Sequence, residues 1–189
     1  MIQIVDAALA DSARRSGALL ACRPGCSQCC VGAFAINQLD AARLRAGLSN
    51  LELRNPARAT RLKERVASAI SRFSATFPGD PQTGLLDEKE DVAWENFAND
   101  EPCPVLDPVT GTCELYEYRP VICRTFGPPI MEDGDLGVCE LCYDGATEEQ
   151  IAACEMKPDP ENLEDALLKE FENAGAPQER TTVAFCLGV

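Results

Sequence analysis

The chain of 189 residues contains no histidine, one tryptophan and three tyrosines. Without histidine there can be no Ser–His–Asp triad, no Cys–His catalytic pair and no H-E-x-x-H zinc protease site. A zinc finger of the mixed cysteine–histidine type is excluded for the same reason. Any transition-metal site must therefore use thiolates, helped at most by carboxylates, and thiolates favour zinc, Cu(I) and iron–sulfur clusters.

Long apolar segments are also missing. No window approaches 18 uncharged apolar residues, so we expect no transmembrane helix. The first residues have no basic region, and Asp6 and Asp11 interrupt their apolar stretch, so they do not predict a secretory signal. We therefore expect a cytoplasmic protein in a reducing compartment.

Cysteine, by contrast, is abundant, with eleven residues. In a reducing compartment, clustered cysteines more often bind metal or take part in catalysis than form disulfides. An odd number of cysteines also cannot pair completely. We expect metal binding, and a disulfide-bonded protein is the alternative.

The net charge of −14 is divided unevenly between the two ends of the chain. Residues 1–77 carry a charge of +6, whereas residues 78–189 carry −20. So acidic a chain is a poor binder of nucleic acid, and nothing in it predicts attraction to a membrane. The basic part either packs against the acidic part or offers a face to an unknown protein partner.

The spacing of apolar residues predicts several helices. Residues 2–16 form one, ending before Gly17. Asn37 caps a short helix through Leu44, which Gly47 closes. Asn55-Pro56 opens the most regular helix, and Pro78-Gly79 stops it. Its apolar stripe consists of Leu62, Val66, Ile70, Phe73 and Phe77.

The second half of the chain is less regular. Residues 103–118 predict a small hairpin that turns at residues 107–111. Residues 147–150 form a capping box for a short helix to about Cys154, and a further helix runs over residues 160–173 and ends at Gly175. We therefore expect a mainly α fold, or α+β with at most a small hairpin, as an irregular single domain organised by metal. This domain covers residues 1–189, with a cysteine-cluster region at about 20–145 and a helical C-terminal extension at about 146–189.

The pattern Cys22-x3-Cys26-x2-Cys29-Cys30 places four thiols within nine residues, on irregular backbone. A tetrahedral zinc needs sulfurs about 2.3 Å from one centre, and close spacing across the Pro24-Gly25 turn lets one loop supply several. Adjacent side chains usually diverge. Cys29 and Cys30 are therefore expected to serve two metals, or one metal and one bridging position.

More thiols follow downstream. Cys103, Cys113 and Cys123 are spaced ten residues apart, and Cys139-x2-Cys142 comes next. The predicted metal ligands are Cys22, Cys26, Cys29, Cys30, Cys103, Cys113, Cys123 and Cys139, which is enough for two four-cysteine sites. Cys142 could replace one of them. Cys154 and Cys186 are expected to be buried as small hydrophobic residues.

So many thiolates need positive charge and hydrogen-bond donors nearby. Arg119 and Arg124 lie close to Cys123 in the sequence and are the candidates. The alternative is that they form ordinary ion pairs with Glu114 or Glu117.

Two segments carry a family resemblance. They are Cys22-Arg-Pro-Gly-Cys26-Ser-Gln-Cys29-Cys30 and, after Cys103-Pro-Val-Leu, the stretch Cys113-Glu-Leu-Tyr-Glu-Tyr-Arg-Pro-Val-Ile-Cys123-Arg124. Together they resemble the YkgJ-type CxxCxxCC cysteine-cluster family over roughly residues 20–145. The resemblance implies chelation of zinc or iron, with an iron–sulfur cluster as one form of the cofactor. The family motif has two residues in its first gap where this chain has three, and Cys139 fits the family's last cysteine better than Cys142.

Enzyme signals in the sequence are weaker. The spacing of Cys22, Cys26 and Cys29 matches that of radical S-adenosylmethionine enzymes, but no aromatic residue precedes Cys29 and no alternation of strands and helices follows. Cys113-x5-Arg119 has the spacing of a cysteine phosphatase loop, yet its bulky acidic residues cannot cradle phosphate. Flagellin lysine methylases contain a cysteine cluster that resembles this one. The alternative function is therefore an iron–sulfur-dependent protein-modifying enzyme or accessory factor. Whether the chain is an enzyme stays open at this point.

Overall fold

The structure is a computed structural model that describes residues 1–87, 89–132 and 134–188. The described part is mainly helical, and its strands form only two-stranded antiparallel pairs, which confirms the predicted fold class. The chain divides into two compact units. The first unit contains residues 1–24 and 121–167, and the second contains residues 25–120 and 168–189. The single domain predicted over residues 1–189 stays a prediction.

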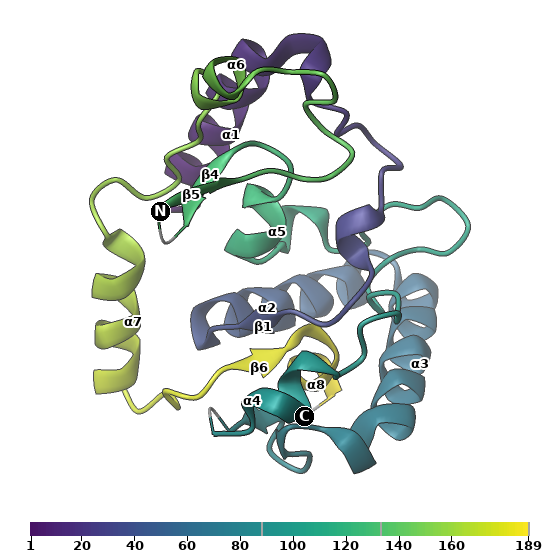
Figure 1. Ribbon diagram of the computed structural model, residues 1–189. Helices are drawn as coiled ribbons and strands as arrows, with labels where there is room; N and C mark the ends of the chain where they lie inside the picture. The colour runs from purple at the N-terminus through teal and green to yellow at the C-terminus, as the bar shows by residue number, and fades with distance from the viewer. Residues whose placement is uncertain (88, 133, 189) are drawn as a thin grey trace. The chain divides into compact units, whose positions relative to one another are not determined.

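The first unit is built on helix α1 (Figure 1). Its elements are α1 (Ile2–Ser16), η1 (Gly17–Leu19), α5 (Val121–Thr125), β4 (Ile130–Glu132), β5 (Asp135–Gly137) and α6 (Glu148–Ala152). Helix α7 (Leu163–Asn173) has residues in both units. Strand β4 pairs with β5 as an antiparallel hairpin.

Hydrogen bonds from α1 anchor the segment that follows α6. The Ser12 hydroxyl donates to the carbonyl of Cys154 at 2.5 Å, and Arg15 donates to the carbonyl of Glu155 at 2.8 Å. The Ser16 hydroxyl lies 2.5 Å from the Tyr143 hydroxyl. Buried polar groups of this kind are stable only when paired, so these bonds fix α1 against the segment that carries Cys142 and Cys154.

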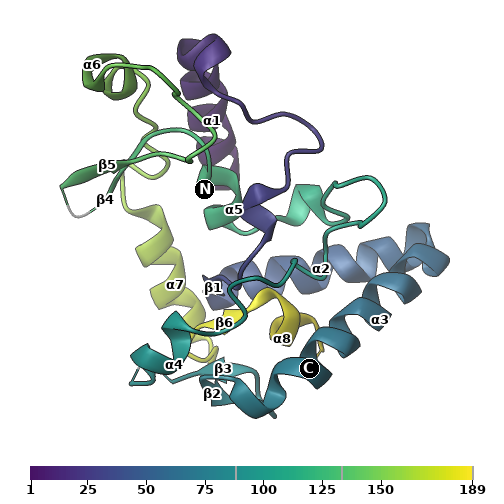
Figure 2. The same cartoon turned by 45° about the vertical axis from the view of Figure 1, so that its right-hand side comes forward.

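The second unit is mainly helical, and short strands lie among its helices (Figure 2). Its elements are η2 (Gln28–Cys30), β1 (Ala35–Ile36), α2 (Gln38–Arg54), α3 (Pro56–Phe73), η3 (Ser74–Thr76), β2 (Gly79–Asp80), β3 (Leu85–Leu86), α4 (Asp91–Glu95), η4 (Tyr116–Tyr118), β6 (Thr181–Thr182) and α8 (Val183–Gly188). Strand β1 pairs with β6, so residues far apart in the sequence meet inside this unit.

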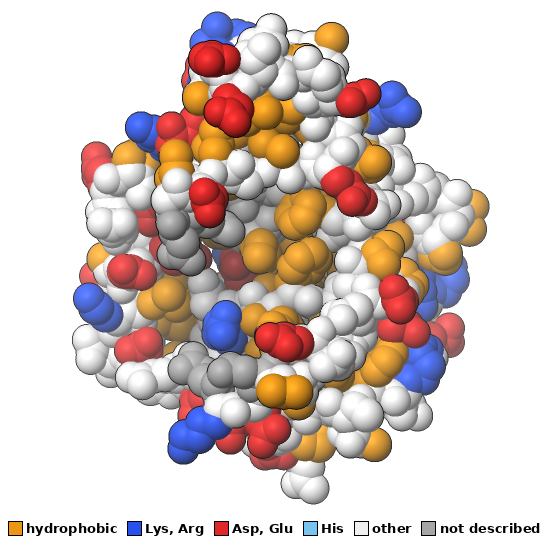
Figure 3. Space-filling view, in the orientation of Figure 1, with side chains coloured by type: hydrophobic (Ala, Val, Ile, Leu, Met, Phe, Trp, Pro, Cys, Tyr) orange, Lys and Arg blue, Asp and Glu red, His pale blue; other side chains and the backbone are white. Residues whose placement is uncertain are grey.

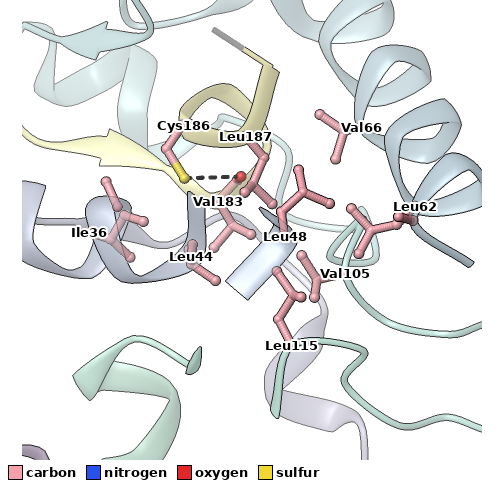
Figure 4. Close-up of a cluster of buried hydrophobic side chains, with 12 residues drawn as sticks. Ile36, Leu44, Leu48, Leu62, Val66, Val105, Leu115, Val183, Cys186 and Leu187 are labelled. Carbon is pink, nitrogen blue, oxygen red and sulfur yellow. Dashed lines mark hydrogen bonds between the residues drawn. The ribbon is translucent and has the colours of Figure 1, made fainter. Parts of the chain in front are cut away.

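The main core of the second unit lies between α2, α3 and α8 (Figure 4). Leu44 and Leu62 are almost completely buried there, and Val183 and Leu187 of α8 pack against them. Cys186 also lies in this core, where its thiol donates to the carbonyl of Val183 at 3.4 Å. A second cluster of aromatic side chains lies next to it and contains the stacked rings of Phe77 and Phe185.

The predicted helix caps are confirmed. Asn55 accepts a hydrogen bond from the backbone N–H of Arg58, and Asn37 accepts one from Asp40. The capping box that opens α6 is present, and α1 ends before Gly17 as predicted.

Three predicted helix bounds are wrong. Helix α3 ends at Phe73 and is followed by η3, so it stops before Pro78-Gly79, and Phe77 of the predicted apolar stripe lies beyond it. Helix α2 does not end at Gly47 but continues to Arg54. Glycine at this position serves packing, because a Cβ on Gly47 would lie 2.6 Å from Cγ of the Tyr118 ring. Helix α7 begins at Leu163 rather than at residue 160, because the Asp159 carboxylate accepts the backbone N–H groups of Leu163 and Glu164 and so caps the helix there.

The acidic side chains do not gather into one patch on the face that Figure 3 shows. On the face that Figure 3 shows, aspartate and glutamate side chains are scattered and lysine and arginine lie among them. Among the described residues, no helix has the length and apolar character needed to cross a membrane.

Candidate metal centre

Backbone pairing brings three cysteine-bearing segments of the second unit together. Val31 forms an antiparallel bridge with Pro102, and the N–H of Cys103 donates to the carbonyl of Cys30 at 2.7 Å. Leu106 forms a second bridge with Cys113. The segment 103–106 is therefore flanked by the cysteine pair on one side and by Cys113 on the other.

The predicted hairpin over residues 103–118 is present, but it is shorter than predicted. It consists of the bridge from Leu106 to Cys113 and a turn in which Gly111 donates to the carbonyl of Asp107 at 2.9 Å. The Asp107 carboxylate also accepts the N–H of Val109 at 2.8 Å, which closes the turn. After Cys113 the chain enters the short helix η4 instead of a second strand.

The adjacent thiols of Cys29 and Cys30 interact with each other. The sequence predicted that they diverge, but the tight helix η2 brings them within hydrogen-bond reach. The Cys30 thiol donates to the Cys29 sulfur, and this lowers the pKa of Cys29 to about 6. The same hydrogen bond, together with burial, raises the pKa of Cys30 above its ordinary value.

Cys103 and Cys113 belong to the same group of thiols. Burial raises the pKa of Cys103 to about 11 and raises the pKa of Cys113 as well. Each of them also acts electrostatically on Cys30, in the direction that raises the pKa of Cys30. Four of the eight predicted ligands, Cys29, Cys30, Cys103 and Cys113, therefore lie in one electrostatically coupled cluster, which we call the second-unit thiol cluster.

Cys26 lies in the same unit, close to this cluster in sequence. The turn before it comes near the hairpin turn, since a Cβ on Gly111 would lie 3.4 Å from the carbonyl oxygen of Gly25. Cys26 is half-buried. Its place at the edge of this region fits the predicted ligand role, which stays a prediction.

The remaining predicted ligands, Cys22, Cys123 and Cys139, lie in the first unit. Gly127 lies between two of them: a Cβ there would lie 2.5 Å from the Cys22 sulfur, and the N–H of Cys139 donates to the carbonyl of Gly127 at 3.5 Å. Cys123 lies on α5, four residues before Gly127. A larger residue at position 127 would fill the space that Gly127 leaves for the Cys22 sulfur.

The other cysteines are buried, and this confirms the prediction for Cys154 and Cys186. Cys154 packs with Cys142 and Tyr143 in the first unit. Cys142 is buried whereas Cys139 is half-buried, so Cys139 is the more accessible of the two thiols in the C-x2-C pair.

The two candidate arginines differ in their surroundings. Arg119 acts on the thiol cluster. The hydrogen bond from Cys30 lowers the pKa of Cys29 most, and the positive charge of Arg119 lowers it further. The same charge offsets part of the rise that burial causes in the pKa of Cys113. Its guanidinium lies 3.7 Å from the centre of the Tyr116 ring. Arg124 is buried in the first unit and pairs with Asp6 at 2.5 Å, a partner that neither reading of the sequence predicted.

Glu114 was expected only as a possible ion-pair partner of Arg119 or Arg124, but its partners are different. Its carboxylate is 3% exposed and pairs with Arg58 and Arg65 of α3. The sequence offered a signal in the two arginines seven residues apart on one side of the predicted helix, but it gave no indication of which acidic residue they face.

The donor set suits a thiolate-bound metal. It supplies sulfur ligands and a cation, Arg119, that offsets part of their negative charge. No disulfide joins any two cysteines in the described part of the chain. Within residues 1–87, 89–132 and 134–188, no three Cys, Asp or Glu side chains are already arranged to hold an ion.

Comparisons with known proteins agree with this chemistry. Neither the curated proteins nor the solved structures returned a match to the chain. A protein-family model named CxxCxxCC and described as "Putative zinc- or iron-chelating domain" matches residues 21–164, which include all eight predicted ligands. The chain therefore belongs to the CxxCxxCC family of zinc- or iron-chelating domains.

Proposed function

We propose that this protein chelates zinc or iron through clustered cysteine thiolates, and that Cys29, Cys30, Cys103 and Cys113 form one of its sites. The observation that carries the proposal is the convergence of three separate segments, each with thiols, on one electrostatically coupled cluster. Membership of a zinc- or iron-chelating family supports the same chemistry.

Each of the four residues has a part in the proposed site. Cys29, whose pKa is lowered to about 6, supplies a thiolate near neutral pH, whereas Cys30, Cys103 and Cys113 lose protons only when the metal binds. Arg119 limits the repulsion between the thiolates. A bound ion would supply the cross-link that holds η2 and the hairpin together, since structural four-cysteine sites contribute directly to folding.

The type of metal centre and the place of a second site are argued from the chemistry and positions of the cysteines. An iron–sulfur cluster uses the same four-thiolate ligation as a zinc ion, so the second-unit thiol cluster suits either. Cys22, Cys123 and Cys139, with Cys142 beside them in sequence, form the candidate for a second site in the first unit. The protein-modifying alternative has no support from the comparisons, and the cytoplasmic location stays a prediction.

The test is metal analysis together with an absorption spectrum on protein purified without oxygen. Zinc without visible absorption supports a structural or chelating role, and iron with matching sulfide and broad visible absorption supports a cluster. Cys29→Ser and Cys113→Ser should each lower the metal content, whereas Cys154→Ala, which changes a buried thiol in the other unit, should keep it. Full metal content in both serine variants would overturn the assignment of this site.

A further inference from the structure

The segments that carry Cys103 and Cys113 are fastened to α3 by one group of charged side chains. Arg58 donates to one oxygen of Glu114 at 2.6 Å, and Arg65 pairs with the other oxygen. Arg65 also donates through Nε to the carbonyl of Pro104 at 2.9 Å. We call these three side chains the α3 clamp.

The clamp contacts the immediate neighbours of both cysteines. Pro104 follows Cys103, and Glu114 follows Cys113. Arg65 reaches both segments at once, so a single guanidinium holds the two sides of the hairpin in register. A planar guanidinium can do this because it presents several donors in a fixed geometry, which a lysine cannot copy.

The hairpin geometry carries the effect from Glu114 to the thiol. Cys113 forms a bridge with Leu106, and the N–H of Glu114 donates to the carbonyl of Val105 at 2.9 Å, so both residues are tied to the segment that follows Cys103. While Glu114 is held by α3, the adjacent Cys113 packs against the core cluster and acts electrostatically on Cys30.

Glu114 is buried, so its carboxylate depends on the two arginines of the α3 clamp. Its carboxylate is 3% exposed, whereas the Arg58 and Arg65 side chains are 35% and 27% exposed. A buried carboxylate depends on its cationic partners, and removal of Arg65 leaves Glu114 with Arg58 alone. The same change removes the donor to the Pro104 carbonyl, so the segments that carry Cys103 and Cys113 are both held less firmly.

We infer that Arg65 and Glu114 are positioning residues that hold Cys103 and Cys113 in the geometry needed to bind a metal. The inference rests on the proposed function of the second-unit thiol cluster. The two residues act through the backbone of the hairpin and do not touch the ion. Loss of such supporting contacts typically costs about 10- to 100-fold in metal affinity.

The first experiment measures zinc affinity by competition with a chromophoric chelator. We expect Arg65→Ala and the isosteric Glu114→Gln to weaken zinc binding about 10- to 100-fold, and Arg65→Lys to restore only part of the loss. Lys63→Ala is the matched control, because Lys63 lies on α3 like Arg65 but pairs with Glu52 of α2. If Arg65→Ala and Glu114→Gln both bind zinc within twofold of the wild type, the inference is wrong.

Two further readouts separate positioning from a general loss of structure. Arg65→Ala should cost less additional affinity in the Cys113→Ser background than in the wild type, because part of its effect passes through Cys113 and the rest through Cys103. An additional loss as large as in the wild type would contradict the inference. With Co²⁺ as the probe, the thiolate charge-transfer absorption should weaken in Glu114→Gln, and an unchanged spectrum would contradict it too.

A metal-independent readout separates this inference from the proposed function. In protein freed of metal, Arg65→Ala should make Cys103 and Cys113 react faster with an alkylating agent, as mass spectrometry can follow, while Cys154 keeps its rate. If the wild type binds neither zinc nor Co²⁺, the proposed function fails, and faster alkylation still shows that the clamp places the thiols. If the alkylation rates are also unchanged, the clamp does not position them.

Discussion

Cys29 and Cys30 are consecutive residues with the same side chain and opposite acid–base behaviour. The hydrogen bond from Cys30 to Cys29 lowers the pKa of Cys29 to about 6 and raises that of Cys30. One thiol is therefore ready to bind a soft ion at neutral pH while its neighbour keeps its proton. A metal that binds to both must break this hydrogen bond and release the proton of Cys30.

The pKa values predict a steep dependence of metal binding on pH. Cys30, Cys103 and Cys113 are protonated at pH 7, since their pKa values lie above the ordinary value, so protons compete with the metal for three thiolates. Zinc affinity should therefore rise with pH, by about 1,000-fold per unit between pH 7 and 8. Calorimetry in two buffers with different ionisation enthalpies should show about three protons released per zinc at pH 7.5. Release of less than one proton would contradict this prediction.

Gly127 is the residue at which the first unit is most sensitive to an added methyl group. Its φ of +115° is unfavourable for any other residue, and a Cβ would lie 2.5 Å from the Cys22 sulfur. Gly127→Ala should lower the free energy of unfolding by more than the roughly 1–3 kcal/mol expected from the backbone strain alone. A urea titration followed by circular dichroism measures this loss.

The matched control is Gly145→Ala. Gly145 also has a positive φ, +71°, but no atom lies within 4 Å of its added Cβ. The difference between the two variants isolates the collision with Cys22. Equal losses would mean that the Cys22 sulfur is free to move aside.

At the level of elements, α3 has two faces with different tasks. Its apolar face packs Leu62 and Val66 into the core, while Arg58 and Arg65 hold the cysteine hairpin. The same helix therefore supports both the core of the second unit and the thiol cluster. A change on either face has its own measurable consequence.

Shortening a core side chain of α3 should reduce stability without changing the ligands. Leu62 is fully buried, so Leu62→Ala should cost about 2–5 kcal/mol of unfolding free energy. Arg61→Ala is the control, because it changes an exposed neighbour on the same helix and should stay near the wild type. Chemical denaturation of both variants tests this, and similar midpoints would place Leu62 outside the core.

The elements that the sequence predicts well are those with local signals. Asn55 and Asn37 cap their helices as expected, since a cap depends on residues within one turn. Gly47 misled the prediction of the end of α2, because its role is to admit the Tyr118 ring from a distant segment. The helix α5 is only five residues long, and its residues carry no cap or periodic pattern that marks it.

In the candidate site, too, some features can be predicted from the sequence and others cannot. Spacing alone singles out the cysteines and the family, because clustering of thiols is visible in the sequence. The pairing of Val31 with Pro102, and the burial of Glu114 between two arginines, depend on contacts across long stretches of chain. No sequence pattern specifies such contacts, so the grouping of Cys29 and Cys30 with Cys103 and Cys113 emerges only from the fold.

For the whole molecule, metal binding and folding should be linked. The four thiols come from three segments that an unfolded chain does not hold together, so zinc binds the folded protein preferentially. Zinc at 100 times its dissociation constant should then raise the free energy of unfolding by about 2.7 kcal/mol. Thermal melts with zinc and with a chelator measure the shift, and Cys29→Ser should reduce it. Identical melting of the two wild-type samples would show that no metal stabilises the fold.

The return of α8 into the core beside α2 and α3 has a consequence for synthesis on the ribosome. Val183, Cys186 and Leu187 complete a core whose other members lie before residue 120, and residues 121–167 are translated in between. At roughly 5–20 residues per second, the nascent chain carries Cys29, Cys30, Cys103 and Cys113 outside a finished core for several seconds. During this interval the thiols are open to oxidants and to wrong metals, so correct loading depends on the metal and redox state of the compartment where translation ends.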